Sequence, residues 1–128
     1  MKSNKVFIAS SLAVLACFTI PHLGQAEGPS LARGKDTFDK RCGGCHSLDR
    51  DKEGPRLRGV YGRMAGSVSS FNYSTALKNA HISWDAESLD KWLSDPDKVV
   101  PDTDMAFHVD KVDERRDIIA YLKDLSGK

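Results

Sequence analysis

Two cysteines and a histidine stand close together at Cys42, Cys45 and His46, in the order Cys-x-x-Cys-His. This motif is typical of covalent c-type haem attachment. Two thiols one helical turn apart can each bond one vinyl group of a single porphyrin. The imidazole of the next residue can then reach the iron, provided that its other nitrogen has an acceptor. We therefore predict that Cys42 and Cys45 attach one haem c and that His46 ligates its iron.

Other kinds of site that use neighbouring cysteines fit this sequence less well. A thioredoxin-like redox pair requires strand–helix–strand surroundings that are not evident here. A zinc site commonly takes four ligands, and beyond residue 26 the chain has only two cysteines and three histidines. A structural disulfide across so short a loop would constrain the unfolded chain little. A thiol–disulfide oxidoreductase is therefore kept as an alternative to a haem protein.

A second axial ligand would come from one of four residues: Met64, His81, Met105 or His108. Met105 lies in a polar stretch, where burial of a methionine is most easily explained if its sulfur has a partner. His108 is the main rival, and a histidine ligand would lower the reduction potential relative to methionine. Ligation by His46 and Met105 leaves no open position for a substrate, so we predict an electron carrier rather than an enzyme. A haem peroxidase or gas-binding protein with a labile Met105 is the alternative.

Apolar side chains at helical spacing predict an all-α fold with three main helices around this motif. The first pattern consists of Leu31, Gly34 and Phe38, with Ser30 as N-cap. The second consists of Ala86, Leu89, Trp92 and Leu93, with Ser83 as N-cap and Pro96 as its stop. The third consists of Ile118, Tyr121, Leu122 and Leu125, with Asp113 near its start and Gly127 beyond its end.

The remaining residues predict one short helix and long loops. The short helix is expected at 73–78, and the stretches 47–70 and 94–112 are rich in glycine, proline and charged residues. Long loops without regular structure are uncommon in a compact domain unless they serve a function. We therefore expect these loops to wrap around the haem.

The first 26 residues differ from the rest of the chain. Lys2 and Lys5 precede an apolar stretch from Val6 to Ile20, and small residues follow up to Ala26. This order is typical of a secretory signal peptide, so we predict cleavage after Ala26 and export to the periplasm. One alternative is an uncleaved membrane anchor, but a stretch of fifteen residues is short for crossing a bilayer. The other alternative is a lipoprotein signal ending at Cys17.

Cleavage changes the charge balance of the protein. The whole chain has 128 residues, 19 basic and 18 acidic side chains, and a net charge of +1. Removing 26 residues takes away two lysines and no acidic side chain, so the domain of residues 27–128 keeps 102 residues and a net charge of −1. Such a charge gives no electrostatic basis for binding nucleic acid. We expect a monomer without stable membrane insertion that meets its redox partners transiently.

The chain resembles the class I cytochromes c, in particular the branch of the mitochondrial carrier and its soluble bacterial relatives. The resemblance covers residues 30–125 and rests on several short motifs besides the two cysteines and His46. In chain order these are Gly34 and Phe38, Gly54-Pro55, Gly62-Arg63 with Gly66, Phe71-Asn72-Tyr73, Ile82-Ser83-Trp84, Leu89 with Trp92-Leu93, Asp95-Pro96, Pro101 to Phe107, and Ile119 to Lys123.

The resemblance implies roles for residues around the haem. The carbonyl of Pro55 would accept the free N–H of His46, and Gly34 would let the first helix cross the last near Tyr121. A buried haem propionate would receive hydrogen bonds from Arg63, Tyr73 and Trp84, with help from Thr103. The haem would be lined or shielded by Phe38, Leu93, Phe107 and Leu122.

Several positions depart from the mitochondrial pattern. Trp92 stands where a tyrosine often donates to the methionine sulfur, and Asp102 replaces a glycine of the ligand loop. Asp97 and Asp104 replace lysines of the basic ring that docks on large oxidases. We therefore expect a docking face of mixed sign. The implied function is a shuttle of single electrons between a respiratory or dehydrogenase donor and a terminal oxidase or reductase.

Overall fold

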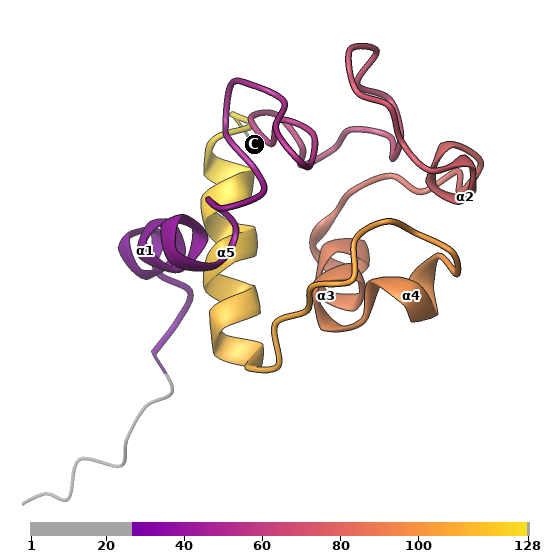
Figure 1. The fold of residues 1–128 in the computed structure, drawn as a ribbon. Coiled ribbons are helices and arrows are strands. Elements are labelled where there is room, and N and C mark those ends of the chain that lie inside the picture. Colours follow the sequence, from indigo (N-terminus) through magenta and orange to yellow (C-terminus); the bar gives the residue numbers. More distant parts are fainter. Residues whose placement is uncertain (1–26, 128) are drawn as a thin grey trace, which may run out of the picture.

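A computed structural model of the chain describes residues 27–127, which form five helices (Figure 1). The three main ones are α1 (Leu31–Arg41), α3 (Ala86–Ser94) and α5 (Val112–Asp124), and the two short ones are α2 (Thr75–Lys78) and α4 (Pro96–Val99). Within the described residues, the only β-type pairing is an isolated antiparallel bridge between Met64 and Ser83. The all-α prediction is confirmed. The predicted signal peptide, residues 1–26 with Cys17, lies outside the described residues.

The helix starts follow from capping side chains, and one predicted cap is wrong. Ser30 caps α1 as predicted, since its side chain accepts a hydrogen bond from a backbone N–H of the first turn. Helix α3 is capped by Asp85 rather than by Ser83. Asp85 and Ser88 each accept a hydrogen bond from the other's backbone N–H, and this reciprocal pairing satisfies two backbone donors at the start of the helix.

Pro96 is predicted to end the second main helix. It follows the end of α3, and it is also the first residue of α4. Asp95 caps the new helix by accepting a hydrogen bond from the Lys98 N–H at 3.2 Å. A proline is well tolerated at the first helical position, where its missing N–H would have no partner in any case. The predicted loop over 94–112 therefore begins with a second short helix.

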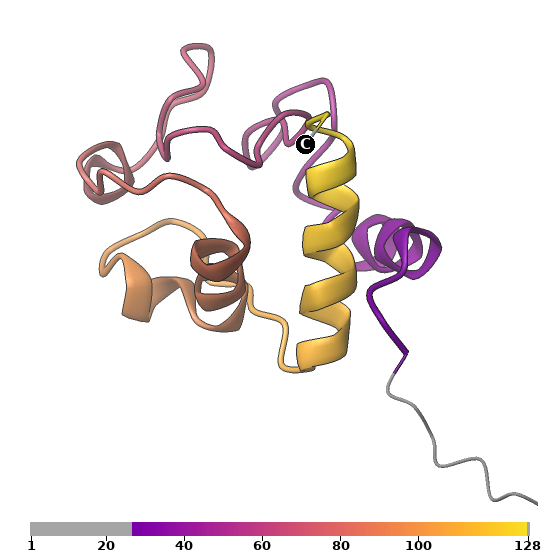
Figure 2. The ribbon, with the colours of Figure 1, turned by 180° about the vertical axis from the view of Figure 1, so that it is seen from behind.

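Helix α1 lies across α5, on the side of α5 away from α3 (Figures 1 and 2). Gly34 is at the crossing, where an added Cβ would lie 2.9 Å from the Tyr121 Cβ and would overlap the carbonyl oxygen of Asp117. The rings of Phe38 and Tyr121 pack edge to face with centroids 5.7 Å apart. The two helices can approach this closely only because residue 34 has no side chain.

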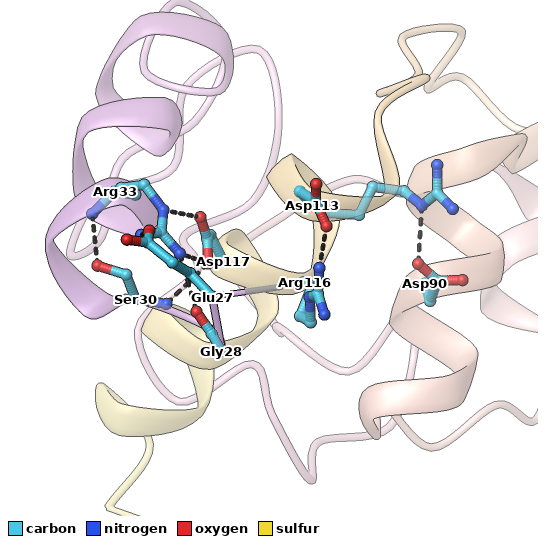
Figure 3. A network of polar contacts seen from close by, with 9 residues as sticks. Glu27, Gly28, Ser30, Arg33, Asp90, Asp113, Arg116 and Asp117 are labelled. Atoms are coloured by element: carbon cyan, nitrogen blue, oxygen red, sulfur yellow. Dashed lines mark hydrogen bonds and ion pairs between the residues drawn. The ribbon is translucent and has the colours of Figure 1, made fainter. Parts of the chain in front are cut away.

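A buried carboxylate fastens the start of α1 to α5 (Figure 3). Asp117 accepts hydrogen bonds from the Ser30 N–H at 2.7 Å and from Arg33 Nε at 2.6 Å. The Arg33 guanidinium also donates to the Glu27 carboxylate and to the Gly28 carbonyl, at 2.8 and 2.9 Å. Residues 27–33 are therefore held against the last helix.

The core is a single cluster of buried side chains shared by the three main helices and the loops. Helix α3 buries Leu89, Trp92 and Leu93, and α5 buries Ile118 and Leu122. None of the helices in residues 27–127 is long and apolar enough to cross a membrane.

Candidate functional site

A cavity of about 500 Å³ lies among α1, α3, α5 and the loops between them. This volume is in the range of sites that hold cofactors. Its walls are mainly apolar, and they include Phe38 and Leu122. All twelve predicted site residues line it: Cys42, Cys45, His46, Pro55, Arg63, Tyr73, Trp84, Trp92, Leu93, Thr103, Met105 and Phe107.

The two cysteines follow directly from the end of α1. The N–H of Cys42 donates to the Phe38 carbonyl at 2.8 Å, and the N–H of His46 donates to the Cys42 carbonyl at 2.8 Å. This turn places both thiols and the imidazole on one wall of the cavity. Burial raises the pKa of the Cys42 thiol to about 11. Redox-active cysteine pairs work through a thiol of lowered pKa, so this environment does not favour a thiol–disulfide oxidoreductase.

The imidazole of His46 is fixed by one hydrogen bond and by close packing. Its Nδ1 lies 2.8 Å from the Pro55 carbonyl, which can only accept, so Nδ1 carries the proton and Nε2 is left free to ligate. Burial lowers the pKa of His46, which keeps the ring neutral. A neutral ring oriented through its second nitrogen is what metal ligation requires.

Gly54 has a role that sequence reasoning did not assign. A Cβ at this position would lie 2.7 Å from His46 Nδ1, so any side chain would push the ring aside. The Gly54 N–H also donates to the Cys45 carbonyl at 2.9 Å, which draws the loop over the imidazole. The only hint in the sequence is its place immediately before Pro55.

Met105 is held from α3. The indole N–H of Trp92 donates to the Met105 sulfur at 3.2 Å, so Trp92 makes the contact that a tyrosine often makes in the family that the sequence resembles. Trp92 is buried and stacks at a tilt against Trp84, with centroids 5.2 Å apart. The Met105 sulfur therefore lies in the apolar wall of the cavity and accepts one hydrogen bond, from the Trp92 indole.

The three rival ligands lie elsewhere. Met64 is 46% exposed and pairs through its backbone with Ser83, away from the cavity lining. His81 and His108 are also absent from the lining, and His108 is exposed and lies 3.4 Å from the Asp110 carboxylate. Of the four candidates, Met105 alone lines the same cavity as His46.

Arg63, Tyr73 and Trp84, the predicted donors to a propionate, all line the cavity. The Arg63 guanidinium donates to the carbonyls of Arg56 and Arg58 at 2.9 and 3.3 Å, and within residues 27–127 it has no carboxylate at ion-pair distance. The backbone N–H of Trp84 donates to the Arg63 carbonyl at 2.9 Å, and Tyr73 lines the same cavity. Burial lowers the pKa of Arg63 and raises that of Tyr73.

Two other predicted residues differ in their surroundings. The hydroxyl oxygen of Thr103 is buried in the cavity wall and has no hydrogen-bond partner among the described residues. A buried polar atom without a partner is costly unless a bound group supplies one. Phe107 lines the cavity but is 44% exposed, so it lies at the mouth rather than deep within.

Comparison with known proteins gives one consistent result. The family model for cytochrome c matches residues 31–126. Cytochrome c from Euglena viridis is 51% identical over 96 residues, which cover 73% of this chain and 94% of that protein. Cytochrome c from Gibberella zeae is 41% identical over 101 residues, covering 76% and 95%. Among solved structures, cytochrome cH from Methylobacterium extorquens superposes with a TM-score of 0.71 at 39% identity, covering 74% of this chain and 98% of that one.

The chain belongs to the cytochrome c family. Its single attachment motif and this family membership define a monohaem electron carrier with one covalently bound haem c. The residues present fit that group. A large apolar cavity is bordered by two cysteines. Within residues 27–127, the Arg63 guanidinium has no carboxylate partner and the Thr103 hydroxyl has no hydrogen-bond partner, so both remain to meet polar substituents.

Proposed function

We propose that this protein carries single electrons with its haem iron held by His46 and Met105. The observation that carries the proposal is that both side chains line one apolar cavity, each fixed by its own hydrogen bond. Cys42 and Cys45 would hold the porphyrin by thioether bonds. Arg63, Tyr73 and Trp84 would donate hydrogen bonds to a propionate, and the Thr103 hydroxyl, which lacks a partner among the described residues, supports its part in the same role.

The bound haem supplies a metal that changes its charge by one unit. The protein residues make that change easy by holding both ligands in place and by keeping water away. Buried side chains such as Leu93 disfavour the more highly charged ferric state, as does a thioether ligand, so we expect a high potential. Because neither ligand needs to leave, one electron can enter and leave with little rearrangement, and the protein is not an enzyme.

Carbon monoxide binding to the ferrous protein at neutral pH tests this reading against a peroxidase or gas sensor. A carrier with both axial positions filled should bind carbon monoxide slowly and weakly. Rapid binding, comparable with that of a Met105→Ala variant, would contradict the proposal and favour a labile ligand.

The partners we propose are a donor and an acceptor protein that dock transiently at the cavity mouth, beside Phe107. Asp97, Asp102 and Asp104 flank the loop of Met105, and none of them is in an ion pair among the described residues. On the cysteine wall, Lys52 donates to the carbonyls of Gly43 and Gly44. Negative charge on the Met105 loop and a lysine beside the attachment motif suit partners of mixed charge, and encounters of this kind are small and weak.

We also propose a soluble periplasmic protein, freed by cleavage after Ala26 and working between a respiratory or dehydrogenase donor and a terminal oxidase or reductase. The support is the order of basic, apolar and small residues in the first 26 positions. Mass spectrometry of the native protein should give a chain that begins at Glu27, in the periplasmic fraction. Retention in salt-washed membranes would contradict cleavage and solubility.

A further inference from the structure

One buried arginine holds the chain segment that follows Met105. Arg115 of α5 is only 7% exposed, and burial of a guanidinium is costly unless its donors are satisfied. Its Nε donates to the Asp90 carboxylate of α3 at 2.7 Å, drawn as the dashed line to Asp90 in Figure 3. Its Nη1 donates to the carbonyls of Val109 and Asp110, both at 2.9 Å. One side chain thus joins α5, α3 and the loop.

The loop around Met105 has few other fastenings. Upstream, the Asp102 N–H donates to the Asp97 carboxylate at 3.3 Å. Downstream, the N–H of the fully buried Val109 donates to the Leu93 carbonyl at 2.7 Å. Between these two anchors, the only hydrogen bond described for residues 103–108 is the one to the Met105 sulfur. The position of Met105 therefore depends on anchors at both ends of this loop.

The two bonds to backbone carbonyls distinguish Arg115 from an ordinary structural ion pair. Asp90 is on the same helix as Trp92, the donor to the Met105 sulfur, so Arg115 ties the loop to the element that also fixes the sulfur. The next residue offers a contrast. Arg116 has a side chain 42% exposed and pairs with Asp113 within its own helix, without reaching the loop.

We infer that Arg115 is a positioning residue that keeps Met105 in place as the sixth iron ligand by clamping the downstream end of its loop to α3. The inference rests on the proposed ligation by Met105. An added ligand can bind the ferric iron only after Met105 leaves, so its apparent affinity reports how easily the loop opens. Loosening the clamp should raise that affinity.

Imidazole titration of the ferric holoprotein, followed by the weak red sulfur-to-iron absorption band, tests the clamp. Losing hydrogen bonds from a charged donor should make Arg115→Gln bind imidazole at least about tenfold more tightly than the wild type. Asp90→Asn, which removes the charge of one of the three acceptors, should give about a threefold increase. Arg116→Gln is the matched control, because it removes the same charge from the same helix, and its affinity should stay within about twofold of the wild type.

Each outcome bears on a different claim. If Arg115→Gln and Arg116→Gln bind imidazole equally, the clamp is contradicted while Met105 ligation stands. If the wild type lacks the red band, both the ligation and the clamp fail. If Arg115→Gln does not retain haem, Asp90→Asn tests the clamp in its place, because it alters a partly exposed side chain and should leave the fold intact. Equality of Asp90→Asn with the Arg116→Gln control would then overturn the inference.

Discussion

The two cavity walls that provide the proposed axial ligands are built in different ways. His46 depends on its near neighbours in sequence: the turn from Cys42, the overlying Gly54 and the carbonyl of Pro55. Met105 depends on α3, α4 and α5, through a few hydrogen bonds to these separate elements. The histidine side is therefore a local structure, whereas the methionine side is a product of tertiary packing. We expect any loosening of the fold to release Met105 before His46.

Gly34→Ala should have the largest effect on the stability of the fold. The new methyl group would overlap a backbone oxygen of Asp117, which cannot swing away as a side chain could. We expect thermal and denaturant unfolding to show a loss of about 3 kcal/mol, at the upper end for overpacking. The red band should weaken, because α5 carries Arg115 and a shift of α5 would disturb Met105. The haem should stay attached.

Gly44→Ala is the control for this substitution. A Cβ at Gly44 meets nothing within 4 Å, although the residue lies inside the attachment motif. Its stability should stay within about 0.5 kcal/mol of the wild type. Equal effects of the two substitutions would contradict the importance of the α1–α5 crossing.

Asp117→Asn should have the next largest effect. Hydrogen bonds from Arg33 and Ser30 hold the pKa of the Asp117 carboxyl below its usual range. The unfolded chain therefore takes up this proton at a higher pH than the folded one, so the stabilisation is present at neutral pH and is lost in acid. We expect a loss of about 2 kcal/mol at pH 7, measured by denaturant unfolding, that shrinks below about pH 4. A loss that stayed constant into acid would contradict the charged-partner account.

Trp92→Phe tests the methionine side alone. It removes the donor to the Met105 sulfur and should cost about 1 kcal/mol. A sulfur relieved of this donor gives more electron density to the iron and favours the ferric state, so voltammetry should show a lower potential. Tyr61→Phe, outside the cavity lining, is the control and should leave the potential unchanged. A potential unaltered by Trp92→Phe would contradict an energetic role for the indole.

Asp104→Lys should have the smallest effect, confined to rates. It reverses a charge that lines the cavity mouth, so reduction by an anionic small complex should become about threefold faster at low ionic strength, and the gain should vanish at high salt. Asp124→Lys makes the same charge change outside the cavity lining. Equal acceleration by both variants would show that net charge, and not the mouth, governs the encounter.

The sequence was most informative where structure is local. The attachment motif, the cap at Ser30 and the apolar stripes of the main helices depend on neighbours within a few residues, so spacing predicted them. The wrong cap at Ser83 and the missed helix at Pro96 arose because two capping residues stand close together and a proline can either stop or start a helix.

Long-range features were less accessible. Resemblance to a family supplied the lining of the cavity, but no pattern marks Arg115 as buried or Gly54 as packed on His46. Arg115 and Arg116 are adjacent in the sequence, and only the packing of α5 against α3 and the loop separates the clamp from a surface charge. Such roles depend on which helix face meets which loop.

The absorption spectrum of the ferric protein at neutral pH tests ligation by His46 and Met105 most directly. The account predicts a weak red sulfur-to-iron band in the wild type that persists in Met64→Leu and disappears in Met105→Ala. A wild-type protein without the band, or a band that survives in Met105→Ala, would contradict it.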